Sequence, residues 1–452
     1  MSRAVVIGLA RTGSAVARAL AANGDDVLVV DRADTEQLRS RAADLPAGVE
    51  VRLGGYAVDV AAGADLVSPS PGVPWDAPEL AWAREHGIAV RSEMDLVFER
   101  CRSRVIGITG TNGKTTTTAL VAAILERGPD RVLLGGNIGV PVLDRLHDLA
   151  PSDWLVLELS SFQIETIAEP RCTVACVLNV TPDHIDRHGS FAAYAGVKER
   201  LVRDAVEWSV LGYDNAITRS MAQQSAAPVR FFGGELGGHD GATAAAGDVV
   251  AVDGGAAHPV LPIADIPLFG PHNLTNVMAA VAVSRAAGID TASVAAGVRE
   301  FHPVAHRLEP VLQQDGVLWV NDSKATNPEA AIVGLRAFAG RPVIWIGGGY
   351  PAEDPPPGLV DAVSDHARFA VLNGASGPLV GRALDRRGYA ARTLEATLAE
   401  AVERARALAR PGDVVLLSPG YKSFDQFADF EARGDTFRDL VRAHVSQQVG
   451  QA

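Results

Sequence analysis

Cysteine is scarce in this chain of 452 residues, which carries only Cys101, Cys172 and Cys176. So few thiols exclude a disulfide framework and indicate a reducing compartment. Cys172 and Cys176 lie together in an apolar, strand-like run, and no second pair of potential ligands follows them. We therefore expect buried thiols at these two positions, with a metal-binding pair as the alternative.

The chain also lacks long hydrophobic runs and runs of lysine or arginine. Its N-terminal apolar stretch covers only Ala4 to Ala10, without a cleavage-site pattern, and nothing approaches the roughly 20 residues of a membrane span. The formal net charge of −13 argues against a nucleic-acid or anionic-membrane partner. It does not exclude an anionic substrate, because a local cluster of charge decides that. We expect a cytoplasmic protein with no nucleic-acid and no membrane partner.

Composition and patterning predict several globular domains. Hydrophobic residues make up 47% of the chain and charged residues 21%, as in soluble globular proteins. The length predicts about three domains. Strand-like and helix-like segments alternate throughout, which predicts an α/β protein with open, mostly parallel sheets. We place the domains at residues 1–100, 101–303 and 304–452.

The most informative stretch runs from Val105 to Leu125 and predicts a strand, a phosphate loop and a helix. In such a turn backbone N–H groups surround phosphate oxygens, the helix N-terminus and a lysine add positive charge, and a hydroxyl reaches Mg²⁺. The strict G-x-x-x-x-G-K-[ST] pattern is not met, because Ile108 stands at the position of the first glycine. A glycine-rich turn without a function is therefore the alternative. The loop residues are Gly110, Thr111, Asn112, Gly113, Lys114, Thr115 and Thr116.

The N-terminal segment predicts a dinucleotide-type βαβ unit. Two apolar strands, residues 3–7 and 27–30, flank a turn with Gly8 and Gly13, and Asp31 follows the second strand. The full G-x-G-x-x-G spacing is absent, so NAD is only weakly indicated. Another phosphate-bearing ligand fits the unit at least as well.

Polar residues after two strands of the middle domain suggest a cation site. Glu158 ends a buried strand, where an unpartnered carboxylate is costly, so we expect it to be exposed or paired with a cation such as Mg²⁺. Residues 183–188 hold two acids and two histidines, which fits a metal or phosphate site about as well as a solvated loop. Without further information, Lys198 is expected to be a surface lysine on the following helix.

Two later segments carry weaker signals. Residues 233–258 are rich in glycine, alanine and aspartate, and we expect a loose hairpin there with little core. A helix that begins at Pro271 places Asn273 and Asn276 on one face, at i and i+3.

Taken in order, these motifs resemble the Mur ligase family, which builds the peptide of bacterial cell-wall precursors, and within it the glutamate-adding MurD type. The resemblance covers the whole chain. The motifs that carry it are Gly-Thr-Asn-Gly-Lys-Thr, Gly-Gly-Asn-Ile-Gly, Leu-Glu-Leu-Ser-Ser-Phe-Gln, Asn-x-Thr-x-Asp-His-x-Asp, His-Asn-x-x-Asn, Asn-Asp-Ser-Lys-Ala-Thr-Asn and Ser-Phe-Asp-Gln-Phe.

The resemblance implies ATP-dependent addition of glutamate to UDP-N-acetylmuramoyl-L-alanine through an acyl phosphate, in peptidoglycan synthesis. It also implies a Rossmann-like N-terminal domain that binds the UDP sugar, a central P-loop ATPase domain, and a Rossmann-like C-terminal domain that binds glutamate. ATP, two Mg²⁺ sites and a monomer are expected. Folylpolyglutamate-type ligases share the phosphate loop but should lack the first domain. A dehydrogenase or a non-catalytic nucleotide-sugar binder would use the first sheet alone.

The resemblance also assigns roles to single residues. The catalytic side chains would be Lys114, Glu158, His184, Lys198 and Lys324. Besides the phosphate loop, ATP would contact Asn273, Asn276, Arg307 and Asp322. The metal ligands would be Thr115, Glu158, His184 and Lys198, the last as a carbamate. The UDP sugar would contact Arg11, Thr12, Asp31, Arg32, Ser70, Gly72 and Asn137. Glutamate would contact Thr326, Lys422, Ser423, Phe424 and Phe430.

The chain departs from the family at a glycine turn of the last domain. D-glutamate-adding ligases usually carry a Gly-Gly-x-x-Lys-Gly pattern there, whose lysine pairs with a carboxylate of the amino acid. Here acids and prolines occupy residues 350–357, whereas Lys422 replaces a small residue. With the lysine at a different position in the pocket, the two carboxylates of glutamate would be bound in a different arrangement. The opposite enantiomer requires such a change, because inversion at Cα exchanges the directions of two substituents. We therefore expect L-glutamate, with a separate epimerase acting on the product; a D-glutamate enzyme with an altered loop is the alternative.

Overall fold

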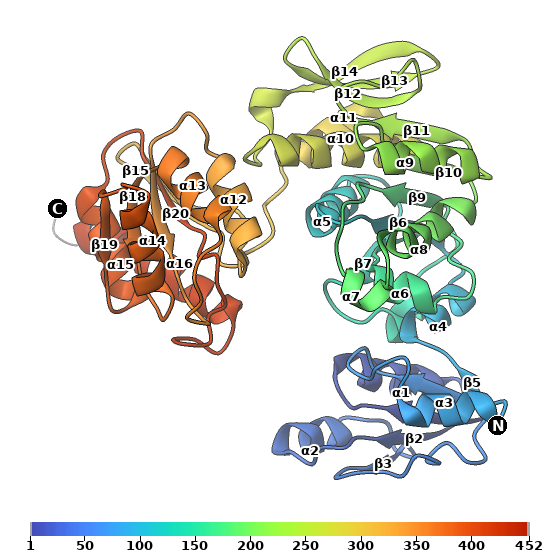
Figure 1. Cartoon of the computed structure of the whole chain (residues 1–452). Coiled ribbons are helices and arrows are strands. Elements are labelled where there is room, and N and C mark those ends of the chain that lie inside the picture. The colour runs from blue at the N-terminus through green and yellow to red at the C-terminus, as the bar shows by residue number, and fades with distance from the viewer. Residues whose placement is uncertain (1, 450–452) are drawn as a thin grey trace. The chain divides into compact units, whose positions relative to one another are not determined.

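The computed structural model describes residues 2–449 and confirms the α/β prediction with three mostly parallel sheets (Figure 1). The chain divides into two compact units. Unit 1 comprises the residues up to Asp265 together with Thr275–Arg299, and unit 2 comprises Ile266–Leu274 together with the chain from Glu300 onward. No helix in residues 2–449 is both long and apolar enough to cross a membrane.

The first sheet has five parallel strands in the order β3-β2-β1-β4-β5. Neighbouring residues of β1 point to opposite faces: Val6 packs on the side of α1, and Val5 packs on the side of α3. The expected βαβ unit is therefore present. The strands are β1 Arg3–Ile7, β2 Asp26–Val30, β3 Glu50–Arg52, β4 Leu66–Pro69 and β5 Ala89–Val90, and the helices are α1 Arg11–Ala22, α2 Glu36–Ala43, α3 Pro78–Glu85 and α4 Glu93–Arg100.

The central sheet has nine strands in the order β14-β13-β12-β11-β10-β9-β6-β8-β7, parallel from β7 to β12. Helix α5 packs with α11, and α8 packs over β9. The strands are β6 Arg104–Thr109, β7 Val132–Gly136, β8 Trp154–Glu158, β9 Val174–Val177, β10 Trp208–Gly212, β11 Val229–Phe232, β12 Gly241–Ala245, β13 Asp248–Asp253 and β14 Ala256–Pro262. The helices are α5 Lys114–Leu125, α6 Ser161–Thr166, α7 Ile185–His188, α8 Phe191–Arg203, α9 Ala216–Met221, α10 Pro271–Ala286 and α11 Thr291–Arg299, with the 3₁₀ helices η1 Leu143–Asp148, η2 Ala222–Gln224 and η3 Ile263–Asp265.

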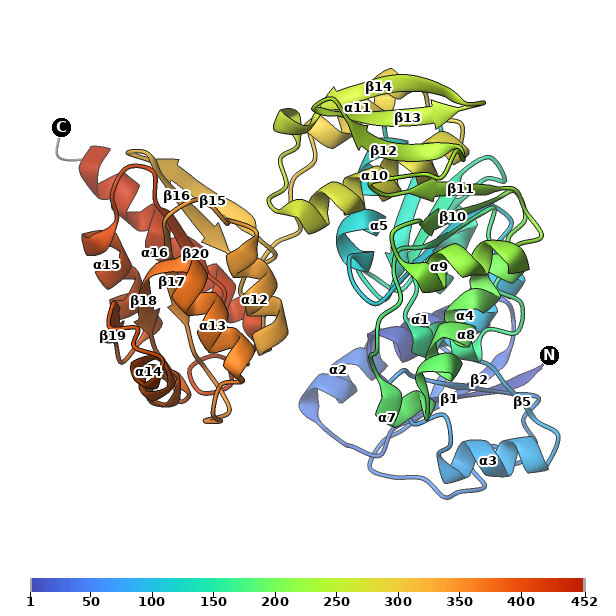
Figure 2. The same ribbon diagram turned by 45° about the horizontal axis from the view of Figure 1, so that its top comes forward.

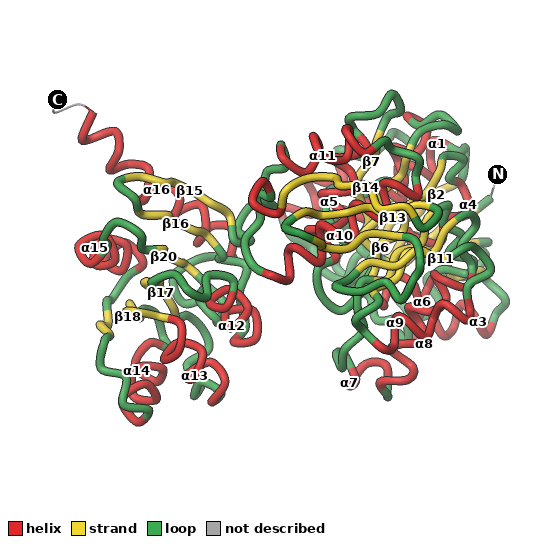
Figure 3. The backbone as a smooth tube through the Cα atoms, turned by 90° about the horizontal axis from the view of Figure 1, so that it is seen from above, coloured by secondary structure: helices red, strands yellow, loops and turns green. Residues whose placement is uncertain are grey.

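The predicted hairpin at residues 233–258 is present, as antiparallel β12 and β13, but the expectation that it is loose and has little core is wrong. Strand β12 joins the central sheet parallel to β11, and β13 and β14, labelled in Figure 3, follow as antiparallel neighbours. Ala242, Val249 and Ala251 are fully buried. Gly241 permits β12 to pair closely with β11, because a Cβ there would lie 1.7 Å from the carbonyl oxygen of Phe231. Because the side chains are small, the backbones of these strands approach closely and bury them as a core.

The cysteines behave as expected. Cys172 and Cys176 are fully buried free thiols, and burial raises the pKa of both. The Sγ of Cys172 packs under β6, where a Cβ on Gly107 would lie 2.5 Å from it. Cys101 is a half-buried free thiol just after α4, with its Sγ 3.2 Å from the Oγ of Ser103.

The third sheet, in unit 2, has six strands in the order β15-β16-β20-β17-β18-β19, and only the β15–β16 pair is antiparallel. Helices α12, α13 and α14 cover one face, and α15 and α16 cover the other (Figure 2). The strands are β15 Glu309–Gln314, β16 Val317–Asn321, β17 Val343–Gly347, β18 Ala367–Leu372, β19 Arg392–Leu394 and β20 Val414–Leu417, and the helices are α12 Pro328–Arg336, α13 Pro357–His366, α14 Gly377–Arg386, α15 Leu398–Leu408 and α16 Phe430–Val449.

Candidate active site

The predicted phosphate loop joins β6 to α5. Gly113 precedes α5 with φ +84°, and a Cβ there would lie 2.2 Å from the Oδ1 of Asn276, so only glycine fits without strain. The N–H of Asn112 donates to the Oδ1 of Asn179 (2.9 Å), and the N–H of Thr111 donates to the carbonyl oxygen of Asn179 (2.9 Å). The loop is therefore fixed at the N-terminus of α5, where first-turn N–H groups lack intrahelical partners and favour an anion.

Two lysine ammonium groups meet at this loop. The Nζ of Lys114 donates to the carbonyl oxygens of Gly110 (3.0 Å) and Thr111 (2.9 Å). The Nζ of Lys198 donates to the same Gly110 oxygen (3.0 Å) and to the Oγ1 of Thr109 (3.3 Å). Both cations therefore lie where the loop would surround a phosphate.

Lys198 is 1% exposed, so the simple reading of a surface lysine is wrong. Its helix, α8, packs against β9 and carries the side chain into the protein. Burial, and secondly the charge of Lys114, lower the pKa of Lys198 to about 7. A large fraction of this amine is therefore neutral near pH 7, and a neutral amine is the form that reacts with carbon dioxide to give a carbamate.

Glu158 ends β8 beside the end of β6 and is 2% exposed. Its Oε1 accepts a hydrogen bond from the Nδ2 of Asn137 (2.9 Å), whereas its Oε2 has no partner among the described residues. The alternative of an exposed Glu158 is thus wrong. A buried carboxylate oxygen without a partner fits a hard cation such as Mg²⁺.

His184 lies after β9, with its backbone in the left-handed region (φ 50°) and its ring centroid 5.0 Å from that of Phe162. Within residues 2–449, no group of three or more His, Cys, Asp or Glu side chains is gathered as a metal site. The sequence 183–188 therefore forms no such protein-only cage. Mg²⁺ commonly uses one or two carboxylates together with substrate phosphates, so the metal ligands Thr115, Glu158, His184 and Lys198 stay a prediction.

At the carboxyl edge of the first sheet, predicted sugar-binding residues fix the glycine turn. The carboxylate of Asp31 accepts from the N–H groups of Leu9 (2.8 Å) and Ala33 (3.0 Å). The Oγ of Ser70 donates to the carbonyl oxygen of Gly8 (2.8 Å). Asp31 and Ser70 thus act on the backbone of the turn that a ligand would contact.

Arg32 at the same edge has a partner that the sequence analysis missed. Its guanidinium donates to the carboxylate of Glu79 (3.1 Å), which also accepts from the hydroxyl of Tyr56 (2.9 Å). Glu79 is 2% exposed, on α3. The residues Arg11, Thr12 and Gly72 are exposed or half-buried here, and Asn137, which is also predicted to contact the sugar, donates to Glu158.

The predicted pair Asn273 and Asn276 lies in the first turns of α10, as expected, and both side chains are buried. The Nδ2 of Asn273 donates to the carbonyl oxygen of Phe269 (2.7 Å), within unit 2. Asn276 belongs to unit 1, where its amide contacts the phosphate loop at Gly113. The N-terminus of α10 therefore spans the division of the chain into two units.

In unit 2 Asp322 follows β16 and is buried. Its carboxylate accepts from the Oγ of Ser418 (2.7 Å) and from the N–H of Leu308 (3.2 Å). Burial raises the pKa of Asp322 to about 7, against the opposing effects of these hydrogen bonds and the charge of Arg307. The turn that bears Arg307 is thereby tied to the end of the third sheet.

The predicted glutamate-binding residues follow β16 and β20. Lys324 places its Nζ 5.5 Å from the centre of the Phe430 ring. Ser423 is buried, whereas Phe424 and Lys422 are exposed. Thr326 is half-buried two residues beyond Lys324.

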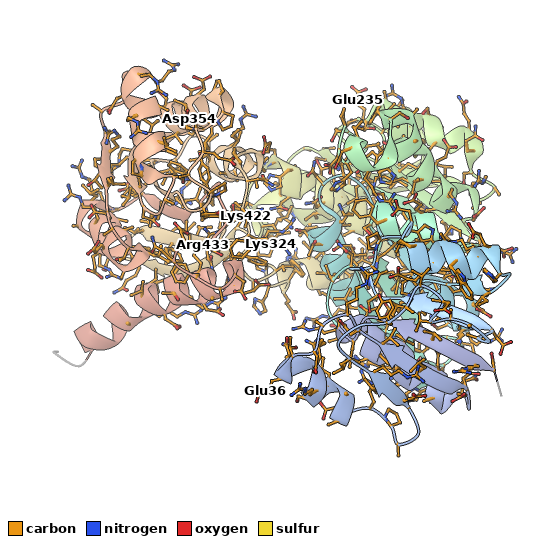
Figure 4. All side chains as sticks on the ribbon, turned by 60° about the horizontal axis from the view of Figure 1, so that its bottom comes forward. Glu36, Glu235, Lys324, Asp354, Lys422 and Arg433 are labelled. Carbon is orange, nitrogen blue, oxygen red and sulfur yellow. The ribbon has the colours of Figure 1, made fainter. Side chains whose placement is uncertain are left out.

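Arg433, which the sequence analysis missed, lies beneath this group. It is 3% exposed and donates to the Oγ (2.9 Å) and carbonyl oxygen (2.8 Å) of Ser323 and to the carbonyl oxygen of Tyr421 (3.0 Å). Figure 4 labels Arg433 close to Lys324 and Lys422. The available signal was its position three residues after Phe430, one turn along a helix.

Three family models match the chain, and each covers all or nearly all of the segment that forms one of the three sheets. Residues 2–92 match the Mur ligase MurD-like N-terminal domain, residues 108–284 match the Mur ligase middle domain, and residues 306–420 match the Mur ligase glutamate ligase domain.

Similar proteins span the whole length of the chain. A protein of Gloeobacter violaceus is 42% identical over 452 residues, covering 99% of this chain and all of the relative, and one of Pelotomaculum thermopropionicum is 39% identical over 442 residues, covering 97% of each. Both bear the name UDP-N-acetylmuramoylalanine–D-glutamate ligase. Among solved structures, UDP-N-acetylmuramate-alanine ligase MurC from Thermotoga maritima matches with a TM-score of 0.63 and 19% identity, covering 98% of this chain and all of that one. This structural match supports the fold alone.

Proposed function

The chain belongs to the Mur ligase family of ATP-dependent ligases, and from this premise we propose that it adds D-glutamate to UDP-N-acetylmuramoyl-L-alanine in peptidoglycan precursor synthesis. The observation that carries the chemistry is the buried Glu158 carboxylate with one unpartnered oxygen, which ends the strand beside β6 and its phosphate loop. A magnesium nucleotide would supply a cation for this oxygen and phosphate oxygens for Lys114 and Lys198 at the loop.

The expected preference for L-glutamate is not supported. The full-length relatives are named for D-glutamate, which favours the alternative of a D-glutamate enzyme with an altered loop. With D-glutamate the product needs no inversion, so the expected epimerase partner is not part of this proposal.

The reaction begins with a poor electrophile. The terminal carboxylate of the L-alanyl group takes the γ-phosphoryl group of ATP, forming an acyl phosphate and releasing ADP. Two anions must meet in this step, and Lys114 and Lys324 reduce their repulsion. Bound Mg²⁺ supplies further charge neutralisation on the phosphoryl group. The amine of glutamate then attacks the acyl carbon, a proton is lost from nitrogen, and phosphate leaves as the amide forms.

The remaining assignments are part of the proposal. Thr115, Glu158, His184 and a carbamate on Lys198 would serve two metal sites, and the burial and lowered pKa of Lys198 support carbamate formation. Asn276, against the phosphate loop, supports a role in nucleotide binding. The turn held by Asp31 and Ser70 supports binding of the UDP sugar at the first sheet. The three free thiols support a reducing, cytoplasmic location.

The rival functions account for less of the molecule. A folylpolyglutamate-type ligase should lack the first domain, whereas residues 2–92 match the MurD-like N-terminal model. A dehydrogenase or a non-catalytic nucleotide-sugar binder would leave Lys114, Glu158 and Lys198 without a purpose.

The test is a direct assay of amide formation. Purified protein receives ATP, Mg²⁺, UDP-N-acetylmuramoyl-L-alanine and either D- or L-glutamate, and product mass and ADP release are measured. We expect a new amide and stoichiometric ADP with D-glutamate. Product with L-glutamate only would reverse the choice of enantiomer, and no amide with either would refute the ligase function.

A further inference from the structure

Lysine usage in this chain is unusual. Only four positions are lysine, namely Lys114, Lys198, Lys324 and Lys422, whereas the other 37 basic residues are arginine. Exposed ion pairs of unit 2, such as Arg387 with Asp361, accordingly use arginine. Three of the lysines belong to the proposed catalytic residues, where a compact ammonium on a flexible stem differs in function from a guanidinium. The fourth, Lys422, therefore stands out from the surface charges.

Lys422 is fixed opposite the glycine turn that lacks the family's lysine. The N–H of Tyr350 donates to the carbonyl oxygen of Lys422 (2.8 Å), and the N–H of Lys422 donates to that of Tyr350 (2.9 Å), as an isolated antiparallel bridge. In such a pair the two side chains lie on one face, with Cα atoms about 5.5 Å apart.

Gly349 permits this contact, because a Cβ there would lie 2.3 Å from the carbonyl oxygen of Lys422. The loop after β20 is thus joined to the segment in which the usual lysine would stand. Compared with the family's usual lysine, the ammonium of Lys422 stands on the other strand of this bridge, at the same edge of the sheet.

Charges of both signs lie near Lys422: the carboxylates of Glu353 and Asp354 add to the rise in the pKa of Tyr421 that burial causes, whereas Arg433 is a buried cation. Arg433 links the two loops, through Ser323 next to Lys324 and Tyr421 next to Lys422, and these hydrogen bonds go to neutral oxygens. The carboxylate of Asp425 is turned to the N–H of Ala375 (2.9 Å). The exposed Lys422 ammonium forms no ion pair with any residue that the structure describes. Figure 4 shows these three cations at one end of unit 2, with Asp354 labelled apart from them.

We propose that Lys422 binds a carboxylate of the incoming amino-acid dianion, in place of the lysine absent after Gly347–Gly348–Gly349. The inference rests on the proposed function and assigns a specificity-determining residue to it. Buried Arg433, whose hydrogen bonds go to Ser323 and Tyr421, adds positive charge at this edge without facing the ligand, so the exposed Lys422 is the cation that a second carboxylate of the amino acid can reach.

The first experiment compares steady-state constants of wild type, Lys422→Ala and Lys422→Arg. For Lys422→Ala we expect the KM for glutamate to rise about 10- to 100-fold, the factor for one charge-assisted hydrogen bond. The KM values for ATP and the muramoyl nucleotide should stay within about twofold, and Lys422→Arg should retain only part of the affinity, because a guanidinium keeps the charge but not the compact ammonium. Arg386→Ala, an exposed cation at the end of α14, is the matched control and should leave every constant unchanged.

The second experiment moves the charge across the bridge. Tyr350 and Lys422 are both exposed, so Tyr350→Lys combined with Lys422→Tyr keeps net charge and composition. We expect this exchange to recover most of the glutamate affinity that Lys422→Tyr alone loses. No recovery would overturn the assignment of the bridge as the device that positions the cation.

Failure of this inference is distinct from failure of the proposed function. A wild-type enzyme that forms the amide, with an unchanged glutamate KM in a folded Lys422→Ala variant, would refute the role of Lys422 and leave the ligase intact. An equal rise in KM for all three substrates would likewise refute it, because it would indicate general damage. Absence of amide in the wild type would instead refute the function on which the inference rests.

Discussion

Lys114 lies at the N-terminus of α5 with its ammonium among the carbonyl oxygens of the phosphate loop. Its charge is fixed before a phosphoryl group arrives, so its removal should act on the transition state. We expect Lys114→Ala to lower kcat by about 10²- to 10³-fold, the effect of losing one preorganised charge stabiliser. ADP release at saturating substrates measures it. Near-normal turnover in a folded variant would refute the assignment of the loop.

Lys198 offers a second test at a single residue. Because its amine is buried and has a lowered pKa, we propose a carbamate there as an anionic ligand. Lys198→Ala should abolish most activity, and short carboxylic acids added at millimolar concentration should restore part of it by supplying the missing anionic oxygen. The same acids added to Lys114→Ala serve as the control and should restore nothing. Equal responses of the two variants would count against the carbamate.

Single residues also show where prediction from sequence succeeds and where it fails. The turn from Gly110 to Lys114 was predictable, because its conformation follows from nearby glycines and the helix they precede. The environment of Lys198 was not, because burial depends on α8 packing against a strand distant in sequence. For the same reason no local pattern pointed to Asn137 as the partner of Glu158, or to Glu79 as the partner of Arg32.

Among the elements, α4 and η1 meet at a buried carboxylate. Glu93, the first residue of α4, is 7% exposed, and the backbone of Val142 and Leu143 only partly offsets the effect of burial on its carboxylate. Its Oε1 has no partner among the described residues. Burial, with a smaller contribution from Asp144, raises the pKa of Glu93 to about 7.

This raised pKa makes stability depend on pH. The folded state holds the proton of Glu93 more tightly than the unfolded chain, where the carboxyl titrates near 4.5. The free energy of unfolding should therefore fall as pH rises from 4.5 to 7 and level off above 7, where both states are ionised.

Glu93→Gln should remove this loss. Relative to wild type, the variant should gain up to about 3 kcal/mol in the free energy of unfolding between pH 5 and pH 8. Denaturant titrations of both proteins at the two pH values measure it, with Glu36→Gln on the exposed side of α2 as the control. If the free energies of unfolding of Glu93→Gln and wild type differed by the same amount at pH 5 and at pH 8, the raised pKa of Glu93 would be contradicted.

Element by element, the parallel strands were predictable because they are apolar runs bounded by glycine and polar turns. The three antiparallel strands β12 to β14 were not, because their core consists partly of alanine, such as Ala242 and Ala251. Such residues contribute by fitting closely between backbones, which depends on partner strands and not on local hydrophobicity.

At the scale of the whole molecule, the residues assigned to one reaction are divided between units. Lys114, Glu158 and Lys198 belong to unit 1, and Asp322 and Lys324 belong to unit 2. We predict that catalysis requires closure of the units, which also protects the acyl phosphate from water. The proposed domain boundaries near residues 100 and 303 fall between the strands of successive sheets.

Small-angle X-ray scattering tests this closure. We expect a non-hydrolysable ATP analogue together with the muramoyl nucleotide to lower the radius of gyration, and each ligand alone to lower it less. Light scattering on the same sample checks the predicted monomer. An unchanged radius with both ligands bound at saturation would contradict closure.

The placement of the cysteines has a practical consequence for such work. Cys172 and Cys176 are sealed in the core with unreactive thiols, whereas Cys101 is half-buried just after α4. A maleimide dye should consequently attach at one position in the native enzyme, without engineering. That single label, at the joint between the first and second sheets, would make the natural protein its own fluorescent reporter of substrate arrival.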